Sequence, residues 1–169
     1  MKRAVIFSLV LICVVLAGFK QTHTPTPYPF PNLRFFPEMP VDTNNPVTIE
    51  GASLGRFLFY DTILSADYSF SCSSCHKQQS AFADTPNQFS KGITGQPLRR
   101  NTMPLFNLAW YNSYFWDGKA GSLEEQVFHP VRAHNEMNLK WKVATERIHQ
   151  SSFYQPKFKA AFGEMPVDS

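Results

Sequence analysis

Two cysteines and a histidine lie close together near the middle of the chain. They belong to the pentapeptide Cys72-Ser73-Ser74-Cys75-His76, which has the C-x-x-C-H spacing at which c-type haem is attached. Two thiols one helical turn apart can add to the two vinyl groups of one porphyrin, and the imidazole of the next residue then points at the iron. The spacing therefore predicts one covalent haem c held by Cys72 and Cys75, with His76 as axial ligand of the iron.

Other uses of the same pentapeptide fit the surrounding sequence less well. A thioredoxin-type redox pair requires a preceding strand in a βαβ setting, which the sequence does not indicate. A zinc site requires four ligands at suitable spacing, and no second cysteine pair is present. A chance match within a structural turn is the remaining alternative. Haem attachment is the interpretation that uses all three chemically active residues.

The first twenty residues predict the compartment. Lys2 and Arg3 precede an apolar run from Ala4 to Ala17, the pattern of an export signal. Because this run is shorter than the roughly 20 apolar residues that usually span a bilayer, residues 1–20 are expected to be a signal peptide, with an uncleaved membrane anchor as the alternative. Either places the protein in the periplasm or elsewhere outside the cytoplasm, where covalent haem attachment takes place.

The rest of the chain must position the cysteines and the histidine. Residues 21–46 contain seven prolines and predict an extended arm, which interleaved phenylalanines should pack on the body. Residues 47–169 are long enough for one core. The 15% aromatic content excludes general disorder. The net charge of +3 gives no sign of nucleic-acid binding.

Apolar spacing within the domain predicts short helices separated by loops. Helices are expected over 48–60, from Leu123 to just before Pro130, over 139–149, and from about Pro156 to Phe162. Residues 84–105, rich in Pro, Gly, Asn and Asp, predict a long irregular loop. The fold class is therefore all-α, a cytochrome c-like haem domain with short helices, long loops and an N-terminal proline-rich arm.

Beyond the pentapeptide, the sequence from about Asn45 to Phe162 resembles the bacterial di-haem cytochrome c peroxidases and their methylamine-utilisation relatives. The landmarks shared in order are Leu54-Gly55-Arg56, Leu58-Phe59-Tyr60-Asp61, Leu64-Ser65, Cys72 to His76, Phe82-Ala83-Asp84, Arg100-Asn101, Asn107-Leu108-Ala109, Phe115-Trp116-Asp117-Gly118, Ser122-Leu123-Glu124-Glu125-Gln126, Pro130 and Glu136-Met137. Each is weak alone, whereas their common order is specific. The resemblance implies the N-terminal half of such a protein, which carries the peroxide-reacting haem.

The resemblance also implies roles for four further residues. Glu136 and Gln126 match the catalytic polar pair on the distal side of the haem, Trp116 matches a tryptophan between the two haems, and Asn101 matches a residue that supports a calcium site. Peroxide cleavage requires a proton to move between the two oxygens, which a carboxylate such as Glu136 can do. Gln126 can donate a hydrogen bond that orients the oxidant.

Two departures from the family pattern bear on this interpretation. Where many relatives have a histidine as a removable sixth iron ligand, this chain has Lys91. Lys91 either ligates the iron as a neutral amine or is solvated, which leaves the haem five-coordinate. Relatives are also about twice as long and carry a second haem domain. The chain is therefore either a fragment, the interpretation we favour, or a single-haem unit.

The resulting hypothesis is a c-type haem peroxidase domain that reduces hydrogen peroxide to water. Its electrons would come from a small cytochrome c or a cupredoxin and would pass Trp116. The main alternative is a single-haem electron-transfer cytochrome c with Met137 or Met103 as sixth ligand. A relative that oxidises a protein or a natural product is a third interpretation.

Overall fold

The first long helix begins where a threonine can cap it. In the computed structural model, which describes residues 24–163, helix α2 spans Ile49–Tyr60, and the Thr48 side chain accepts a hydrogen bond from the Gly51 N–H at 3.0 Å. The carboxylate of Asp61, just after α2, accepts from the Ile63 N–H and caps the short 3-10 helix η1, Thr62–Leu64. The predicted leader, residues 1–20, lies outside the described residues.

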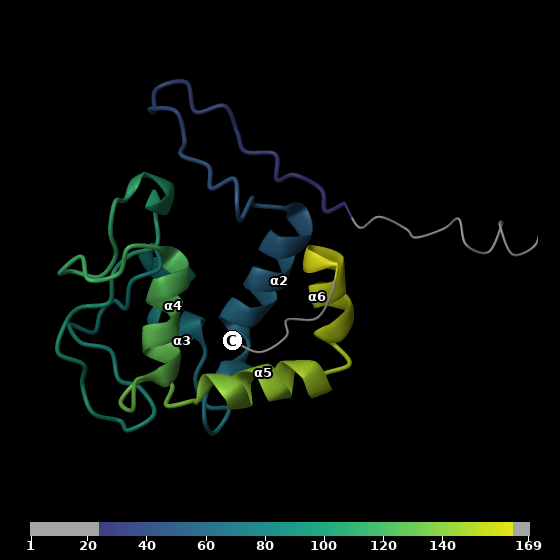
Figure 1. Cartoon of the computed structure of the whole chain (residues 1–169). Helices are drawn as coiled ribbons and strands as arrows, with labels where there is room; N and C mark the ends of the chain where they lie inside the picture. Colours follow the sequence, from purple (N-terminus) through teal and green to yellow (C-terminus); the bar gives the residue numbers. More distant parts are fainter. Residues whose placement is uncertain (1–23, 164–169) are drawn as a thin grey trace, which may run out of the picture.

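The remaining elements are also short and helical. In chain order they are α3 Cys72–Cys75, η2 Gln78–Ser80, η3 Leu108–Trp110, α4 Leu123–Arg132, α5 Trp141–Gln150 and α6 Gln155–Phe162. Within residues 24–163 there are isolated bridges but no β-strand, so the predicted all-α class is confirmed. The long loop predicted at 84–105 contains neither helix nor strand. In Figure 1, α2 lies beside α6, and α5 joins α4 to this pair.

The expectation that α4 stops before Pro130 is wrong. The helix continues to Arg132, and the Ala133 N–H closes it by donating to the His129 carbonyl at 2.8 Å. Pro130 lies inside the helix and lacks the N–H that would bond the carbonyl one turn earlier, so α4 forgoes that hydrogen bond. Val131 is fully buried, and its burial in the core favours the extra turn.

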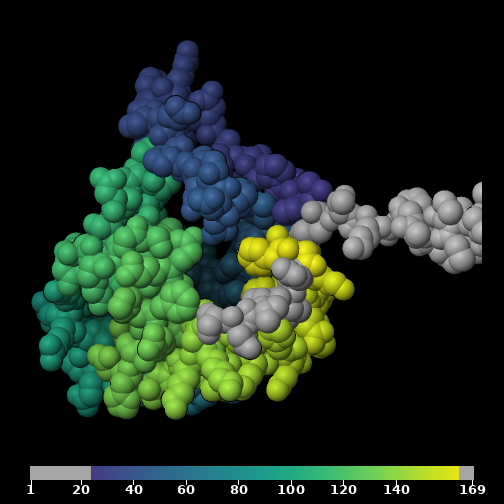
Figure 2. Space-filling model, in the orientation of Figure 1, coloured from purple at the N-terminus to yellow at the C-terminus, as the bar shows by residue number. Residues whose placement is uncertain are grey.

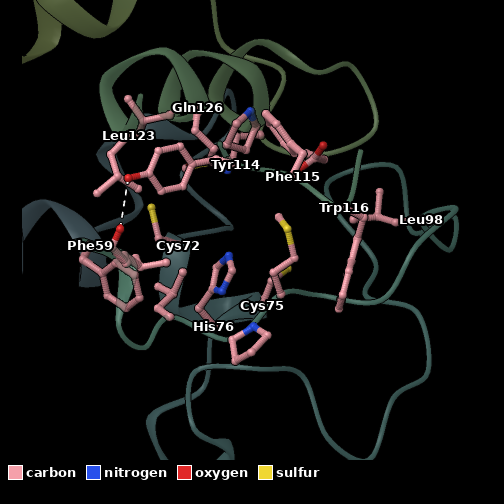
Figure 3. Close-up of a pocket in the computed structure, with 18 of the residues that line it drawn as sticks. Phe59, Cys72, Cys75, His76, Leu98, Tyr114, Phe115, Trp116, Leu123 and Gln126 are labelled. Carbon is pink, nitrogen blue, oxygen red and sulfur yellow. Dashed lines mark hydrogen bonds between the residues drawn. The ribbon is translucent and has the colours of Figure 1, made fainter. Parts of the chain in front are cut away.

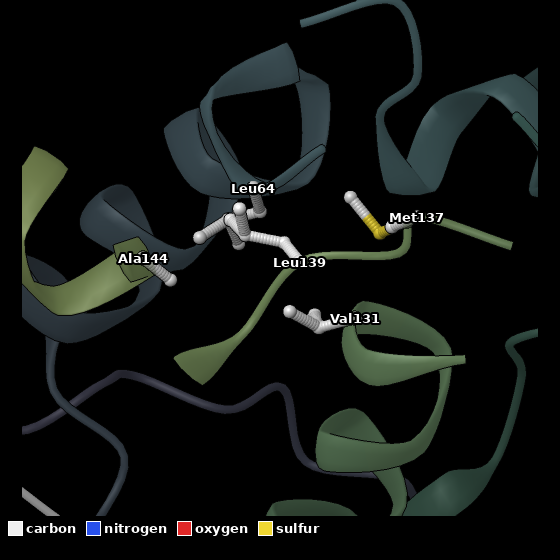
Figure 4. Close-up of a cluster of buried hydrophobic side chains, with 5 residues drawn as sticks. All are labelled: Leu64, Val131, Met137, Leu139 and Ala144. Carbon is white, nitrogen blue, oxygen red and sulfur yellow. The ribbon is translucent and has the colours of Figure 1, made fainter. Parts of the chain in front are cut away.

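The core consists of two clusters of buried apolar side chains. One contains Leu64, Val131, Met137, Leu139 and Ala144 and brings η1, α4 and α5 together (Figure 4). The other joins α2, α5 and α6 and contains Leu54, Ile148, Tyr154 and Ala161. Leu58 and Ile63 pack against both clusters, so the helices form one body that can hold the loops in place.

The proline-rich arm contacts this body at its start and near its tip. Its first residues lie beside the segment just before α2, where the Tyr28 N–H donates to the Val47 carbonyl at 3.0 Å. Near the tip, Phe36 and Trp110 have ring centroids 5.4 Å apart. The expectation that the arm's phenylalanines pack on the body is correct only in part, because Phe35 is 94% exposed. Figure 2 shows the arm projecting beyond the helical body.

A helix must be both long and apolar to cross a bilayer. Among residues 24–163, no helix combines the two well enough to cross a membrane.

Replacing Tyr154 with phenylalanine should lower the free energy of unfolding by about 1.5–3 kcal/mol, since the hydroxyl bonds a charged partner. Tyr154 is 1% exposed, and its hydroxyl donates to Asp61 Oδ2 at 2.6 Å. Urea denaturation followed by circular dichroism measures the loss. The control is Tyr60→Phe, because the Tyr60 hydroxyl donates to Gln78 on the exposed surface. Equal losses in the two variants would contradict the prediction.

Candidate haem-attachment site

The two cysteines lie on a single helical turn. Helix α3 begins after Ser71, whose backbone N–H donates to the Ser74 hydroxyl at 3.1 Å, and it closes where the His76 N–H donates to the Cys72 carbonyl at 2.9 Å. Both cysteines are free thiols that line one cavity. Burial raises the pKa of Cys72 to about 11 and also raises the pKa of Cys75. Both thiols are therefore protonated at neutral pH.

A sharp turn after α3 orients the imidazole of His76. Ala81 and Phe82 both adopt left-handed backbone conformations, with φ of 54° and 60°, which are uncommon for residues other than glycine. This turn brings the Phe82 carbonyl to 2.9 Å from His76 Nδ1. Burial lowers the pKa of His76 despite the nearby carbonyls of Phe82 and Met103. A neutral imidazole that donates from Nδ1 leaves the Nε2 lone pair for a metal.

The cavity next to these three residues has a volume of about 600 Å³, within the usual range for cofactor sites. In Figure 3 Cys72, Cys75 and His76 lie along one side of it, while Tyr114, Phe115, Leu123 and Gln126 lie across from them and Trp116 and Leu98 lie at one end. Most of the lining side chains are apolar or aromatic. Two thiols, one imidazole and an apolar chamber fit a covalently attached porphyrin.

Glu136 and Gln126 line the same cavity as the attachment turn. Gln126 comes from α4, and Glu136 comes from the turn after it, where the Glu136 N–H donates to the Ala133 carbonyl at 3.0 Å. Burial raises the pKa of Glu136, and the nearby charge of Lys119 opposes this shift. With Trp116, which also lines it, the cavity thus brings together six of the predicted site residues.

Trp116 and Asn101 are the predicted site residues that are exposed at the surface. Trp116 lines the cavity but is 59% exposed, and its indole N–H donates to the Asn101 carbonyl at 2.8 Å. Asn101 donates its own side-chain amide to the Gln88 carbonyl at 2.7 Å. Within residues 24–163 no group of three or more His, Cys, Asp and Glu side chains could hold a metal ion. Calcium binding at Asn101 remains a prediction.

The candidate sixth ligands also differ in position. Lys91 is exposed and lies outside the cavity wall, as expected of a solvated side chain. Met137 borders the cavity but is 6% exposed and belongs to the core cluster of Figure 4. Met103 lies in the cavity wall, and a hydrogen bond to its carbonyl raises the pKa of His76, against the larger effect of burial.

Sequence reasoning missed two features that shape the wall. Tyr114 and Phe115 form part of the side that faces the attachment turn (Figure 3), and the Tyr114 hydroxyl donates to the Leu108 carbonyl at 3.1 Å. Lys119, whose Nζ lies 4.4 Å from the centre of the Phe115 ring, provides the charge near Glu136. These residues occupy an irregular segment without apolar periodicity, so their position could not be inferred from spacing.

A helical domain with an apolar cavity lined by a Cys-x-x-Cys-His turn belongs to the class of c-type haem proteins. The family model described as di-haem cytochrome c peroxidase matches residues 49–169. The chain therefore belongs to the di-haem cytochrome c peroxidase family, whose members bind c-type haem. The predicted resemblance is confirmed.

Individual relatives agree with this assignment. The chain is 40% identical over 124 residues to the methylamine utilization protein MauG of Methylorubrum extorquens, a match that covers 73% of this chain and 35% of that protein. It is 36% identical over 133 residues to the cytochrome-c peroxidase IdrP1 of a Pseudomonas species, covering 79% of this chain and 35% of the relative. The chain thus spans about a third of the length of the curated relatives that it matches.

Solved structures show the same fold. The structure superposes on the crystal structure of a MauG-like protein associated with microbial copper homeostasis with a TM-score of 0.75 and 32% sequence identity, covering 83% of this chain and 41% of the other. The diheme peroxidase BthA of Burkholderia thailandensis superposes with a TM-score of 0.61 at 25% identity, covering 74% and 34% of the two chains.

Proposed function

We propose that this chain forms the peroxide-reacting haem domain of a di-haem peroxidase. It takes one covalent haem on Cys72 and Cys75, with His76 on the iron, and reduces hydrogen peroxide to water with electrons from a small cytochrome c or a cupredoxin. The observation that carries the proposal is that Glu136 and Gln126 line the same cavity as the attachment turn. The named peroxidases among its relatives support the same reaction class. The proposal includes export directed by residues 1–20.

The chain's own residues account for the proton transfer. The overall reaction, H₂O₂ + 2e⁻ + 2H⁺ → 2H₂O, needs a group that takes a proton from one peroxide oxygen and gives it to the other. The Glu136 carboxylate performs this transfer, and because its raised pKa lies nearer to neutrality it is suited to both steps. The Gln126 amide donates a hydrogen bond that holds the oxidant. When bound, the haem iron supplies electrons to the O–O bond.

Electrons would enter along the exposed end of the cavity. Trp116 is more than half exposed and is fixed by its bond to the Asn101 carbonyl. The Arg100 guanidinium lies 2.9 Å from the Asp117 carboxylate. This ion pair is a second contact between the segment that contains Asn101 and the segment that contains Trp116. An indole held between the haem cavity and the surface is a suitable place for electrons to arrive from the second haem domain that the longer relatives carry.

The experiment that tests this function uses the full chain, produced in a host that matures c-type cytochromes. Rapid mixing with hydrogen peroxide should change the haem spectrum at a rate linear in peroxide concentration. With a reduced small c-type cytochrome present, two donor molecules should be oxidised for each peroxide consumed. A haem that does not react with peroxide would contradict the proposal. A purely low-spin ferric spectrum would contradict the alternative in which Lys91 is solvated and the haem is five-coordinate.

A further inference from the structure

A buried acidic group lies just behind the attachment turn. Asp84 is 6% exposed, and its Oδ1 lies 2.5 Å from Lys77 Nζ and 3.2 Å from the side-chain nitrogen of Asn87. Its Oδ2 accepts a hydrogen bond from the Ser90 hydroxyl at 2.6 Å, and Ser90 is only 1% exposed. Because Lys77 follows His76 directly, Asp84 joins the haem-attachment segment to the loop that contains Ser90. Neither Asp84 nor Ser90 lines the haem cavity.

The loop after Ser90 packs closely against the backbone of Glu136. A Cβ atom on Gly92 would overlap the Asn135 carbonyl oxygen and would lie 2.5 Å from Glu136 Cα and 2.7 Å from Glu136 O. The next residue donates its backbone N–H to this same oxygen, with 2.9 Å between Ile93 N and Glu136 O. Glycine at position 92 is therefore required by this close approach, and the loop fixes the backbone that presents the Glu136 side chain.

The same loop is closed on itself and held at its base. The Leu98 N–H donates to the Ser90 carbonyl at 2.8 Å, and the Ser90 hydroxyl also contacts the Thr102 hydroxyl at 2.5 Å. Burial alone raises the pKa of Asp84, but the hydrogen bonds from Lys77, Ser90 and Asn87 outweigh it and the pKa is lowered. The carboxylate is thus ionised at neutral pH, when its hydrogen bonds are strongest.

We propose that Asp84 and Ser90 are positioning residues, which through the Gly92–Ile93 backbone hold Glu136 at a fixed place in the wall of the cavity that it shares with the attachment turn. We call Lys77, Asp84 and Ser90 together the clamp. The clamp links the segment that contains the proposed iron ligand to the loop that contacts the backbone of Glu136. This inference rests on the proposed function, since it gives the clamp its effect on the peroxide reaction.

The clamp is tested with Asp84→Asn and Ser90→Ala in the full, haem-loaded chain. Ser90→Ala is the milder change because it leaves the Asp84–Lys77 ion pair in place. It also removes a hydrogen bond to the Cys75 sulfur, so its content of covalent haem must first be shown to match that of the unaltered chain. Exchange of the Ile93 backbone N–H, measured by NMR, should become about tenfold faster or more when the loop opens locally. The peroxide step should slow by about 10- to 100-fold, the usual effect of displacing a catalytic group by about an ångström.

The control variant is Asp42→Asn. Asp42 is an exposed carboxylate in the proline-rich arm, where it accepts a hydrogen bond from the Asn44 N–H at 2.8 Å. It should leave both the Ile93 exchange and the peroxide step unchanged. Wild-type exchange and wild-type rate in both clamp variants would overturn the proposal.

A double variant separates positioning from a general loss of structure. If the clamp acts through Glu136, adding Ser90→Ala to Glu136→Gln should slow the peroxide step no further. If the two effects multiply instead, the clamp does not act through Glu136 and the proposal is wrong. If Glu136→Gln alone leaves the rate unchanged, the proposed function fails, and the Ile93 exchange still shows whether the clamp holds the loop.

Discussion

Replacing Cys72 and Cys75 together with alanine should give a chain that carries no covalent haem. Each thioether requires one sulfur, and both sulfurs lie on α3 and line the cavity. Produced in a host that matures c-type cytochromes, the double variant should be colourless after denaturation and acid–acetone extraction, whereas the unaltered chain should keep its haem. Mass spectrometry of the denatured protein measures the same difference, the mass of one haem per chain.

The matched control is Ser73→Ala, which changes the same turn and keeps both thiols. The Ser73 hydroxyl contacts the Ser71 hydroxyl at 2.7 Å. The Ser71 backbone N–H donates to the Ser74 hydroxyl, which the substitution leaves in place, so the turn should still form. This control should carry covalent haem at the level of the unaltered chain. Covalent haem on the Cys72/Cys75 double variant would show that attachment does not use these sulfurs and would remove the basis of the proposed function.

Local spacing predicts those parts of the structure that depend on local chemistry. The two thiols lie on one turn because their separation of three residues fits a helix, and α2 and α6 begin and end close to where caps and apolar spacing place them. Pro130 misled the prediction for α4 because the burial of Val131, two residues beyond the end of the expected helix, is a tertiary effect. Helix propensity is a local property and takes no account of packing in the core.

The site itself depends on contacts that sequence spacing does not contain. Glu136 and Gln126 were placed through the resemblance, since no periodicity brings the turn after α4 to the attachment segment. The clamp was missed because Asp84 and Ser90 lie in an irregular loop where buried polar groups look like ordinary loop residues. Gly92 reads as a loop glycine, and only the closeness of Glu136 explains why a side chain is excluded there.

Replacing Glu136 with glutamine should slow the peroxide step by about 10²- to 10⁴-fold, the usual contribution of a general acid–base group. Glutamine keeps the size and the hydrogen-bonding capacity of the side chain but cannot take up the peroxide proton. The second-order rate constant for the change in haem spectrum, measured by stopped flow, gives the effect directly. The content of covalent haem should remain unchanged because Glu136 takes no part in attachment.

The pH dependence identifies the proton acceptor. Burial raises the pKa of Glu136 above its ordinary value, and Lys119 opposes this shift. Because the ionised carboxylate accepts the proton, the rate should fall as the pH drops through this raised pKa, and this acid limb should disappear in Glu136→Gln. The control is Glu146→Gln, which alters an exposed acid on α5 and should keep both the rate and the limb. If Glu136→Gln stays within about twofold of the unaltered rate, another group moves the proton, since general acid–base catalysis contributes far more than that.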